Sequence, residues 1–264
     1  MNHKLIAIDL DGTLLNKANE LTSFSYKILT ELASKGFTII LASGRPYRSL
    51  APFYQTIGLT SPVIAYNGIH VYNPSDPHFP AVKRTFPKED VIAIASTLGK
   101  RASSFLCEGD KTIYLAREDH YLAHYFPYQD YPHQIGPIET NLHEDAYAMV
   151  FRCSHANLPF LKKTVEAHDS IAFRAWTSSF YSEAYYRGVD KGSALAYLKK
   201  TLGFEKEEVY AFGDSLNDLE MLDEAGHPYA IFHCKSPRLS SKFPSTKKDN
   251  DHDGVALTLA ELFL

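Results

Sequence analysis

Cysteine is scarce in this sequence, and so is any pattern that would place it in a disulfide framework. The 264 residues include three cysteines, Cys107, Cys153 and Cys234, which are odd in number, lie far apart and form no Cys-x-x-Cys pair. Such a set excludes a disulfide-rich secreted scaffold and indicates reduced thiols. We therefore expect a cytoplasmic protein.

Long apolar runs and long basic runs are also missing. No stretch approaches the ~20 apolar residues of a membrane span, and the N-terminal apolar run is too short for a signal peptide. The formal net charge is −4 and the pI is about 6.3. We expect no nucleic-acid partner and no membrane association.

The first apolar segment ends abruptly in two aspartates. Leu5 to Ile8 are four consecutive apolar residues, which predicts a strand buried on both faces. Asp9 and Asp11 lie two residues apart, so in an extended chain they would project from the same side. Gly12 permits a sharp turn after them.

Two neighbouring carboxylates repel each other and lose hydration unless a cation or a proton lies between them. Mg2+ takes carboxylate ligands together with water and phosphate oxygens. An ionised aspartate can attack phosphorus, and a protonated neighbour can act as a general acid. The alternative is an ordinary Asx-type turn. The buried strand directly before the pair favours the functional interpretation.

A helix and a second strand follow. Thr22 or Ser23 is expected to cap a helix that ends before Gly36. Its predicted apolar face consists of Phe24, Ile28, Leu29, Leu32 and Ala33. Residues 37 to 42 then predict a second buried strand. A strand, helix, strand succession implies parallel strands, and open parallel sheets bind ligands at the carboxyl ends of their strands.

The second strand ends in Ser43, Gly44 and Arg45, before a helix expected to begin near Pro46. A hydroxyl and free backbone N–H groups at a helix start suit phosphate oxygens. Ser-Gly alone is an ordinary loop dipeptide. Its expected position on the same sheet edge as Asp9 favours phosphate binding.

Residues 86 to 187 differ in pattern from the segments on either side. Before them, a strand over residues 62 to 66 leads into Asn67-Gly68, a hairpin signal. Within them, two helices and several strands alternate, and the insertion is too long for a crossover, so an α+β domain is expected. The predicted helices cover residues 90–98 and 158–167, and the predicted strands cover 103–107, 112–115, 147–153, 170–175 and 180–186.

Two features of this insertion carry no chemistry by themselves. His120 and His124 lie one helical turn apart, but no Cys or Glu partner follows in a zinc-like pattern. Surface residues, or residues that face the substrate, are the better interpretation. Trp176 is more consistent with packing than with ligand stacking.

Two polar clusters follow the insertion. Lys191 stands at the start of a helix expected to end near Leu202, where the helix dipole disfavours a lysine unless an anion compensates it. A strand over residues 208 to 212 then ends in Gly-Asp-Ser-Leu-Asn-Asp, residues 213 to 218. Acidic side chains again crowd the carboxyl end of a strand.

These four segments resemble, in order, the four motifs of the haloacid dehalogenase (HAD) superfamily. Residues 9 to 13 are similar to motif I, residues 43 to 45 to motif II, Lys191 to motif III of the Cof-like branch (subclass IIB), and residues 213 to 221 to motif IV. The resemblance implies an α/β fold, with a Rossmann-like parallel-sheet HAD core in residues 1–85 and 188–264. Residues 86–187 would be an inserted α+β cap domain of the C2B type, which is expected to decide the substrate.

The resemblance also implies roles for individual residues. Asp9 would be the nucleophile and Asp11 the general acid and base, and Asp9, Asp11 and Asp214 would bind Mg2+. The residues implied to bind the phosphate group are Leu10, Ser43, Gly44, Lys191 and Asn217. The residues implied to support them are Thr13, Arg45 and Asp218.

The implied function is Mg2+-dependent hydrolysis of small phosphomonoesters, such as sugar or cofactor phosphates, through an aspartyl phosphate. The expected partner is the small-molecule substrate, and the protein is expected to be a monomer or a weak dimer. Two alternatives remain open. A phosphomutase or phosphotransferase would use the same site, and a non-catalytic sugar-phosphate sensor would bind without turnover, although the intact motif residues argue against the sensor.

Two later segments complete the sequence. Residues 249 to 254, Asp-Asn-Asp-His-Asp-Gly, imitate the start of an EF-hand loop, but the twelfth position is Ala260 instead of a glutamate, so calcium is not expected. The family has an Asn followed by Asp-Gly-Val-Ala here, and Asn250 with residues 253 to 256 fits. Residues 232 to 236, Phe-His-Cys-Lys-Ser, depart from the small Asn-Ala pair of relatives, so the packing of that loop is not predicted.

Overall fold

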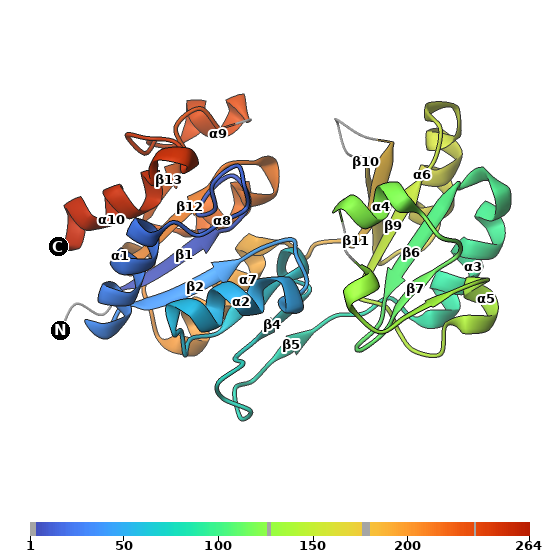
Figure 1. The fold of residues 1–264 in the computed structure, drawn as a ribbon, viewed down its shortest axis with the longest axis horizontal. Helices are drawn as coiled ribbons and strands as arrows, with labels where there is room; N and C mark the ends of the chain where they lie inside the picture. Colours follow the sequence, from blue (N-terminus) through green and yellow to red (C-terminus); the bar gives the residue numbers. More distant parts are fainter. Residues whose placement is uncertain (1–3, 126–127, 176–179, 235) are drawn as a thin grey trace. The chain divides into compact units, whose positions relative to one another are not determined.

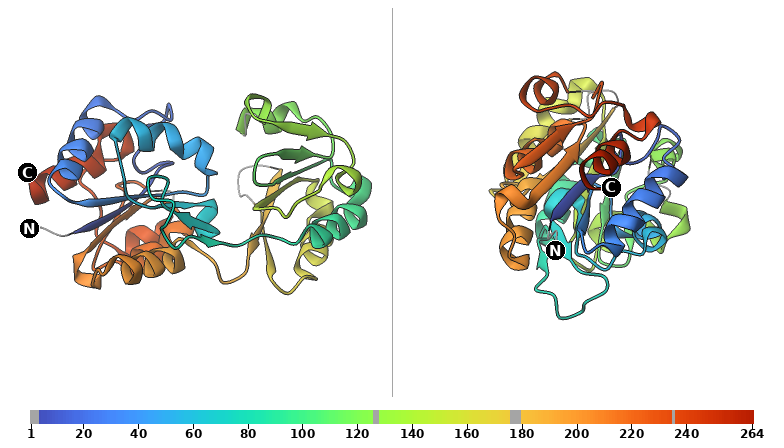
Figure 2. Two further views of the ribbon diagram at one scale, coloured as in Figure 1. Left: turned by 90° about the horizontal axis from the view of Figure 1, so that it is seen from below. Right: turned by 90° about the vertical axis from the view of Figure 1, so that its left-hand side faces the viewer.

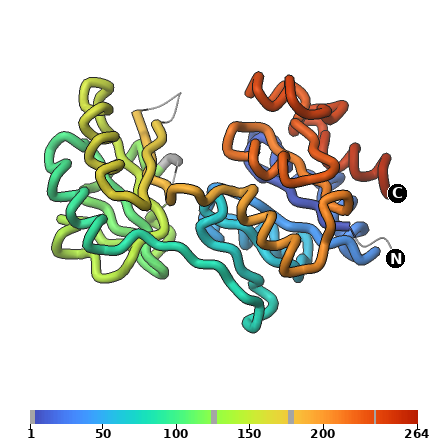
Figure 3. The backbone as a smooth tube through the Cα atoms, turned by 180° about the vertical axis from the view of Figure 1, so that it is seen from behind, coloured from blue at the N-terminus to red at the C-terminus, as the bar shows by residue number. Residues whose placement is uncertain are grey.

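The chain divides into two compact units in the computed structural model, which describes residues 4–125, 128–175, 180–234 and 236–264. The first unit comprises Met1–Lys83 and Val189–Leu264, and the second comprises Arg84–Gly188. The chain leaves the first unit once and returns to it once (Figure 3), so the second unit is an insertion.

The first unit is built on a seven-stranded sheet in the order β13-β12-β1-β2-β3-β4-β5. The strands from β13 to β3 run parallel, and β4 and β5 are antiparallel to their neighbours. This confirms the parallel core. The strands are β1 Leu5–Asp9, β2 Thr38–Ala42, β3 Val63–Ala65, β4 His70–Tyr72, β5 Val82–Lys83, β12 Val209–Gly213 and β13 His227–Ala230.

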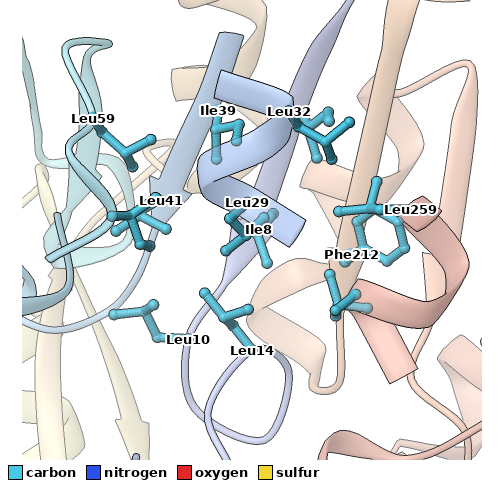
Figure 4. Close-up of a cluster of buried hydrophobic side chains, with 14 of the residues drawn as sticks. Ile8, Leu10, Leu14, Leu29, Leu32, Ile39, Leu41, Leu59, Phe212 and Leu259 are labelled. Carbon is cyan, nitrogen blue, oxygen red and sulfur yellow. The ribbon is translucent and has the colours of Figure 1, made fainter. Parts of the chain in front are cut away.

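Helices cover both faces of this sheet (Figures 1 and 2). One face carries α1 Ser23–Ser34, α2 Tyr47–Ile57 and α10 Gly254–Phe263; the other carries α7 Lys191–Leu202, α8 Leu219–Glu224 and α9 Pro237–Lys242. In β1, Ile8 packs with Leu29 and Leu259 on the first face (Figure 4), whereas Leu5 and Ala7 belong to the cluster on the second. Burial on both faces explains the unbroken apolar run.

Helix α1 follows the predicted pattern except at its start. Thr22 is the N-cap, and its side chain accepts a hydrogen bond from the N–H of Ser25 at 3.0 Å. The predicted place of Phe24 on the buried face is wrong, because Phe24 is 38% exposed. Ser25 is buried instead, because its hydroxyl donates to Asp253 Oδ1 at 2.8 Å.

The second unit contains a six-stranded sheet in the order β10-β11-β9-β6-β7-β8. Its pairs are antiparallel except β7 with β8, which confirms the expected α+β character. The strands are β6 Ser104–Glu108, β7 Ile113–Leu115, β8 His133–Ile135, β9 Ala148–Arg152, β10 Ile171–Ala175 and β11 Tyr181–Tyr186, and the helices are α3 Lys88–Leu98, α4 His120–Tyr125, α5 Ile138–Asn141 and α6 Leu158–Glu166.

One strand of this unit is not predicted from the sequence. Strand β8 has no counterpart among the predicted elements, because all three of its residues are exposed and show no apolar alternation. Trp176 and the side chain of His124 lie outside the described residues.

Within the described ranges, no helix is both long enough and apolar enough to cross a lipid bilayer.

Candidate active site

Buried charged side chains meet at the carboxyl edge of the first unit's sheet. Asp9 ends β1, Asp214 follows β12, and Asp218 ends the short 3₁₀ helix η6 (Leu216–Asp218). Carboxylate oxygens of these three residues, the acidic cluster from here on, lie within 4.8 Å of one another. None of the three is more than 4% exposed. The edge predicted from strand order therefore does carry concentrated negative charge.

Lys191 lies among these carboxylates and is fully buried. Its Nζ donates to Asp9 Oδ1 at 2.5 Å and to Asp218 Oδ1 at 2.6 Å. Asp190 caps α7 by accepting from the N–H of Ser193 at 2.7 Å, which places Lys191 in the first turn. The carboxylates supply the negative charge that a lysine at a helix N-terminus needs.

Asp218 is held by the protein on both of its oxygens. Its Oδ1 accepts from Lys191, and its Oδ2 accepts from the N–H groups of Asp214 at 3.1 Å and Ser215 at 3.0 Å. These bonds shape the loop that presents Asp214. The contacts are consistent with the supporting role expected for Asp218.

Gly12 allows Asp214 to approach the turn after β1. A Cβ atom at position 12 would lie 2.5 Å from Asp214 Oδ2, and the φ angle of Gly12 is +82°. Any L-residue side chain would therefore clash with the carboxylate in a backbone conformation that such residues rarely adopt.

Burial and neighbouring charges shift the pKa values of Asp9 and Lys191. Burial and the Asp218 carboxylate raise the pKa of Asp9 to about 8, although Lys191 acts in the opposite direction. Burial would lower the pKa of Lys191, but Asp218 and Asp9 raise it, so Lys191 remains a cation. Three carboxylates whose oxygens lie this close together fit a hard divalent cation such as Mg2+.

Ser43 and Gly44 lie directly after β2, on the same edge. The Ser43 side chain is buried, and its Oγ accepts from the N–H of Arg45 at 3.1 Å. A Cβ atom on Gly44 would lie 3.0 Å from Nδ2 of Asn67. Asn67 Oδ1 in turn accepts from Asn217 Nδ2 at 2.9 Å, so Asn67 links the loop after β2 to the loop after β12.

The sequence pattern predicts Asn67 only as part of a hairpin turn. It does lie in the turn between β3 and the antiparallel β4, with a φ angle of 55°. The signal that could have identified it as a site residue is its position immediately after a parallel strand of the same sheet, since ligands bind at that edge.

Asp11 is placed differently from Asp9. Strand β1 ends at Asp9, and the N–H groups of Leu14 and Leu15 turn back to the carbonyl of Leu10 at 3.1 and 2.9 Å. The extended geometry expected for Asp9 and Asp11 therefore does not continue past Asp9. Among the described residues, Asp11 is not part of the acidic cluster.

Arg45 holds the Asp11 carboxylate instead. Its Nε donates to Asp11 Oδ2 at 2.8 Å, and its Nη2 pairs with Asp11 Oδ1. The Asp11 side chain is 47% exposed, so this bidentate pair is accessible to water. The motif II arginine therefore contacts the second motif I aspartate directly.

Two neighbours of Asp9 contribute backbone and hydroxyl groups. The side chain of Leu10 is buried in the apolar core, so only its backbone could contact a phosphate. Thr13 is 1% exposed, and its Oγ1 has no hydrogen-bond partner among the residues that the structure describes.

The family model of the haloacid dehalogenase-like hydrolases matches residues 6–259. The chain belongs to this family. It is 28% identical over 265 residues to the 5-amino-6-(5-phospho-D-ribitylamino)uracil phosphatase YitU of Bacillus subtilis (strain 168), with 98% of this chain and 97% of the relative covered. It is also 28% identical over 269 residues to the pyridoxal phosphate phosphatase YbhA of Escherichia coli (strain K12), with 97% of each covered.

A crystal structure of a haloacid dehalogenase-like hydrolase from Bacteroides thetaiotaomicron has the same fold. The TM-score is 0.88 at 23% sequence identity, with 99% of this chain and 100% of that chain covered. Together the comparisons confirm the family resemblance and the predicted fold class. The chain is a Cof-type HAD phosphatase, a hydrolase of phosphoric monoesters.

The structure also describes most of the loop in which this HAD phosphatase departs from the family pattern. The N–H of Ile231 donates to Gly213 O at 3.0 Å, so the loop begins beside the end of β12. The N–H of Phe232 donates to Thr246 Oγ1 at 3.0 Å. Cys234 packs against the apolar clusters on both faces of the sheet, and Lys235 lies outside the described residues.

Proposed function

We propose that this HAD phosphatase uses Mg2+ and hydrolyses small phosphomonoesters, such as sugar or cofactor phosphates, through an aspartyl phosphate at Asp9. The observation that carries the proposal is the buried acidic cluster, whose three carboxylates lie close together beside Lys191. The two relatives are named for the dephosphorylation of a ribitylaminouracil and of pyridoxal phosphate. Those names support a small phosphorylated molecule as the substrate class.

The reaction would take place in two displacements. An oxygen of Asp9 attacks phosphorus, the bond to the leaving oxygen breaks, and Asp11 gives that oxygen a proton. Asp11 then removes a proton from water, which attacks the phosphorus of the aspartyl phosphate and restores the Asp9 carboxylate. The sum is one ester and one water converted to one alcohol and one inorganic phosphate.

Other residues of the edge would bind the phosphoryl oxygens. The ammonium of Lys191 contacts Asp9 and is therefore within reach of the group that Asp9 attacks. The Ser43 hydroxyl, the Gly44 N–H and the Asn217 amide lie on the same edge of the sheet. Donors of this kind stabilise the charge that spreads over the phosphoryl oxygens in the transition state.

Asp9, Asp214 and the backbone carbonyl of Asp11 would hold Mg2+. When bound, the ion would neutralise negative charge and orient the phosphoryl group. Asp218 would support these groups through Lys191 and through the N–H of Asp214.

Asp11, the proposed proton donor, must break its contact with Arg45 before it donates a proton to the leaving oxygen. Arg45, whose guanidinium has only hydrogen-bond donors, binds both oxygens of Asp11 in the structure. Proton donation therefore requires the Asp11 carboxyl group to leave Arg45. Arg45 thus sets the resting position of Asp11.

The test is a panel of phosphomonoesters assayed with purified protein and Mg2+, without any organic phosphoryl acceptor. We expect inorganic phosphate release from some sugar or cofactor phosphates, loss of release in excess chelator, and recovery with added Mg2+. Turnover only after an organic acceptor is added would contradict hydrolysis and support phosphoryl transfer. Binding of substrates without phosphate release across the panel would support a sensor.

A further inference from the structure

The segment that resembles the start of an EF-hand loop contacts the loop that follows motif I. Asn250, in the 3₁₀ helix η7 (Asn250–His252), donates from Nδ2 to the carbonyl of Leu15 at 2.8 Å. Asp251 Oδ1 accepts from the N–H of Lys17 at 2.8 Å, and its Oδ2 lies 2.5 Å from Lys17 Nζ. Two consecutive side chains therefore hold two successive parts of the same loop.

Asp253 holds the far end of that loop. Its Oδ1 accepts from the hydroxyls of Ser25, at 2.8 Å, and Thr22. The N–H of Gly254 donates to Asp249 O at 2.9 Å, which closes residues 249 to 254 into a compact turn. Residues 15 to 25 are thus fixed at three points by one turn at the start of α10.

This loop reaches Asp11 by two routes. Leu15 forms a parallel β-bridge with Asp11, so the backbone that Asn250 binds is paired with the backbone that carries the aspartate. Asn19 Oδ1 accepts from Arg45 Nη2 at 3.3 Å, and the same guanidinium binds the Asp11 carboxylate. A displacement of the loop would therefore move both the main chain of Asp11 and its side-chain partner.

We propose that Asn250 and Asp251 are positioning residues for Asp11. They touch no reacting atom and act through Leu15 and Lys17. Asp9 ends a central strand of the sheet and does not depend on this loop, so the nucleophile keeps its place when the loop shifts. The inference rests on the proposed function, in which Asp11 donates the proton to the leaving oxygen.

The experiment compares leaving groups that do and do not need a proton. An alkoxide requires protonation to leave, whereas p-nitrophenolate, whose conjugate acid has a pKa of about 7, does not. In the double variant Asn250→Ala/Asp251→Ala we expect single-turnover cleavage of an alkyl phosphomonoester to slow about 10- to 100-fold, the scale of a catalytic group misplaced by about 1 Å. The nitrophenolate burst, measured by rapid mixing at saturating Mg2+, should change less than about threefold, because this leaving group does not depend on the position of the Asp11 carboxyl group.

Two further variants serve as controls for this comparison of the two leaving groups. Asn250→Asp keeps the size of the side chain but removes the N–H donor, so it should reproduce the selective loss even if the double variant folds poorly. Lys247→Met breaks the exposed Lys247 to Glu261 contact of 2.9 Å on the same C-terminal segment, and both rates should stay at the wild-type value. Thermal unfolding of each variant reports folding separately from chemistry.

Equal loss of both rates in Asn250→Asp would overturn the inference, and so would unchanged rates in both Asn250→Asp and the double variant. Failure of the proposed function has a different signature. It would appear in the wild-type protein as absent turnover, or in Asp11→Asn as equal loss for both leaving groups, whatever the Asn250 and Asp251 variants do.

Discussion

The two units of the molecule bury carboxylates in opposite ways. In the first unit, Asp9 and Asp218 of the acidic cluster share Lys191, and burial raises the pKa of Asp9. In the second unit, Asp119 is only 6% exposed, but its Oδ1 accepts from the N–H groups of Tyr121 and Leu122, both at 3.0 Å. The hydroxyl of Tyr181 donates to its other oxygen at 3.2 Å.

This difference separates a reactive carboxylate from a structural one. Asp119 caps the start of α4 and is stabilised by neutral donors of its own unit. In the acidic cluster, Asp9 and Asp218 share Lys191 and three carboxylates lie close together, so an added proton or cation would stabilise it. Burial alone does not mark function in this molecule, whereas the crowding of several buried carboxylates at one sheet edge does.

Asp9→Asn should give the largest difference between the units. Loss of the nucleophile should reduce turnover of every phosphomonoester on the order of 10⁴-fold or more. Asp119→Asn, the matched substitution in the second unit, should leave kcat for p-nitrophenyl phosphate within about threefold of wild type. Steady-state phosphate release measures both. Substantial turnover by Asp9→Asn, with folding intact, would contradict the assignment of Asp9 as the nucleophile.

Asp214→Ala and chelation should both affect the Mg2+ dependence of the first unit's site. Removing a carboxylate that would hold Mg2+ should weaken the apparent Mg2+ affinity at least about 100-fold, whereas Asp119→Ala should leave the Mg2+ dependence unchanged. Titration of activity with Mg2+ after treatment with chelator gives both values. Full wild-type turnover in excess chelator would show that the acidic cluster does not need a divalent cation.

Asp119 should instead affect stability. Asp119→Ala removes a helix cap and leaves the Tyr181 hydroxyl buried without its acceptor, so the free energy of unfolding should fall by about 1–3 kcal/mol. Tyr181→Phe, which removes only the hydroxyl, should cost about 1 kcal/mol. Urea denaturation measures the change. A loss of activity in Asp119→Ala without loss of stability would assign Asp119 to chemistry and contradict this distinction.

Asp9 should also make the stability of the protein in chelator depend on pH. The pKa of Asp9 is about 8 in the folded protein, above its ordinary value of 3.8, so its proton binds more tightly to the folded state. Its contribution to stability is therefore complete below pH 3.8 and is lost as the pH rises toward 8. Between pH 5 and 8, wild type should lose stability faster than Asp9→Asn, by at most about 1.4 kcal/mol per pH unit. Parallel pH profiles of the two proteins would contradict this.

Much of the site is predictable from the sequence because the order of the parallel strands determines which residues lie at the same sheet edge. Asp9, Ser43 and Asp214 each follow a buried apolar run, and the carboxyl ends of parallel strands share one edge. Their proximity therefore needs no side-chain detail. The parallel core and the α+β insertion are predictable in the same way, from the order and spacing of apolar segments.

Other features depend on the geometry of turns and long side chains, which the pattern of apolar and polar residues does not predict. The pairing of Asp11 with Arg45 follows from a turn that begins directly after Asp9 and from the direction of a long side chain. Phe24 is exposed while Ser25 is buried and donates to Asp253, which is distant in the sequence. The exposed strand β8 shows no apolar alternation, so no periodicity could reveal it.

The role of Asp11 is the central chemical claim, and pre-steady-state kinetics of Asp11→Asn test it most directly. With p-nitrophenyl phosphate, we expect a nitrophenolate burst close to the wild-type rate, followed by almost no turnover, because water activation also needs Asp11. Acid-quenched samples should then contain a phosphorylated peptide that includes Asp9. With an alkyl phosphomonoester, the first step itself should slow about 10²- to 10⁴-fold. Equal loss of the first step for both leaving groups would show that Asp11 is not the general acid.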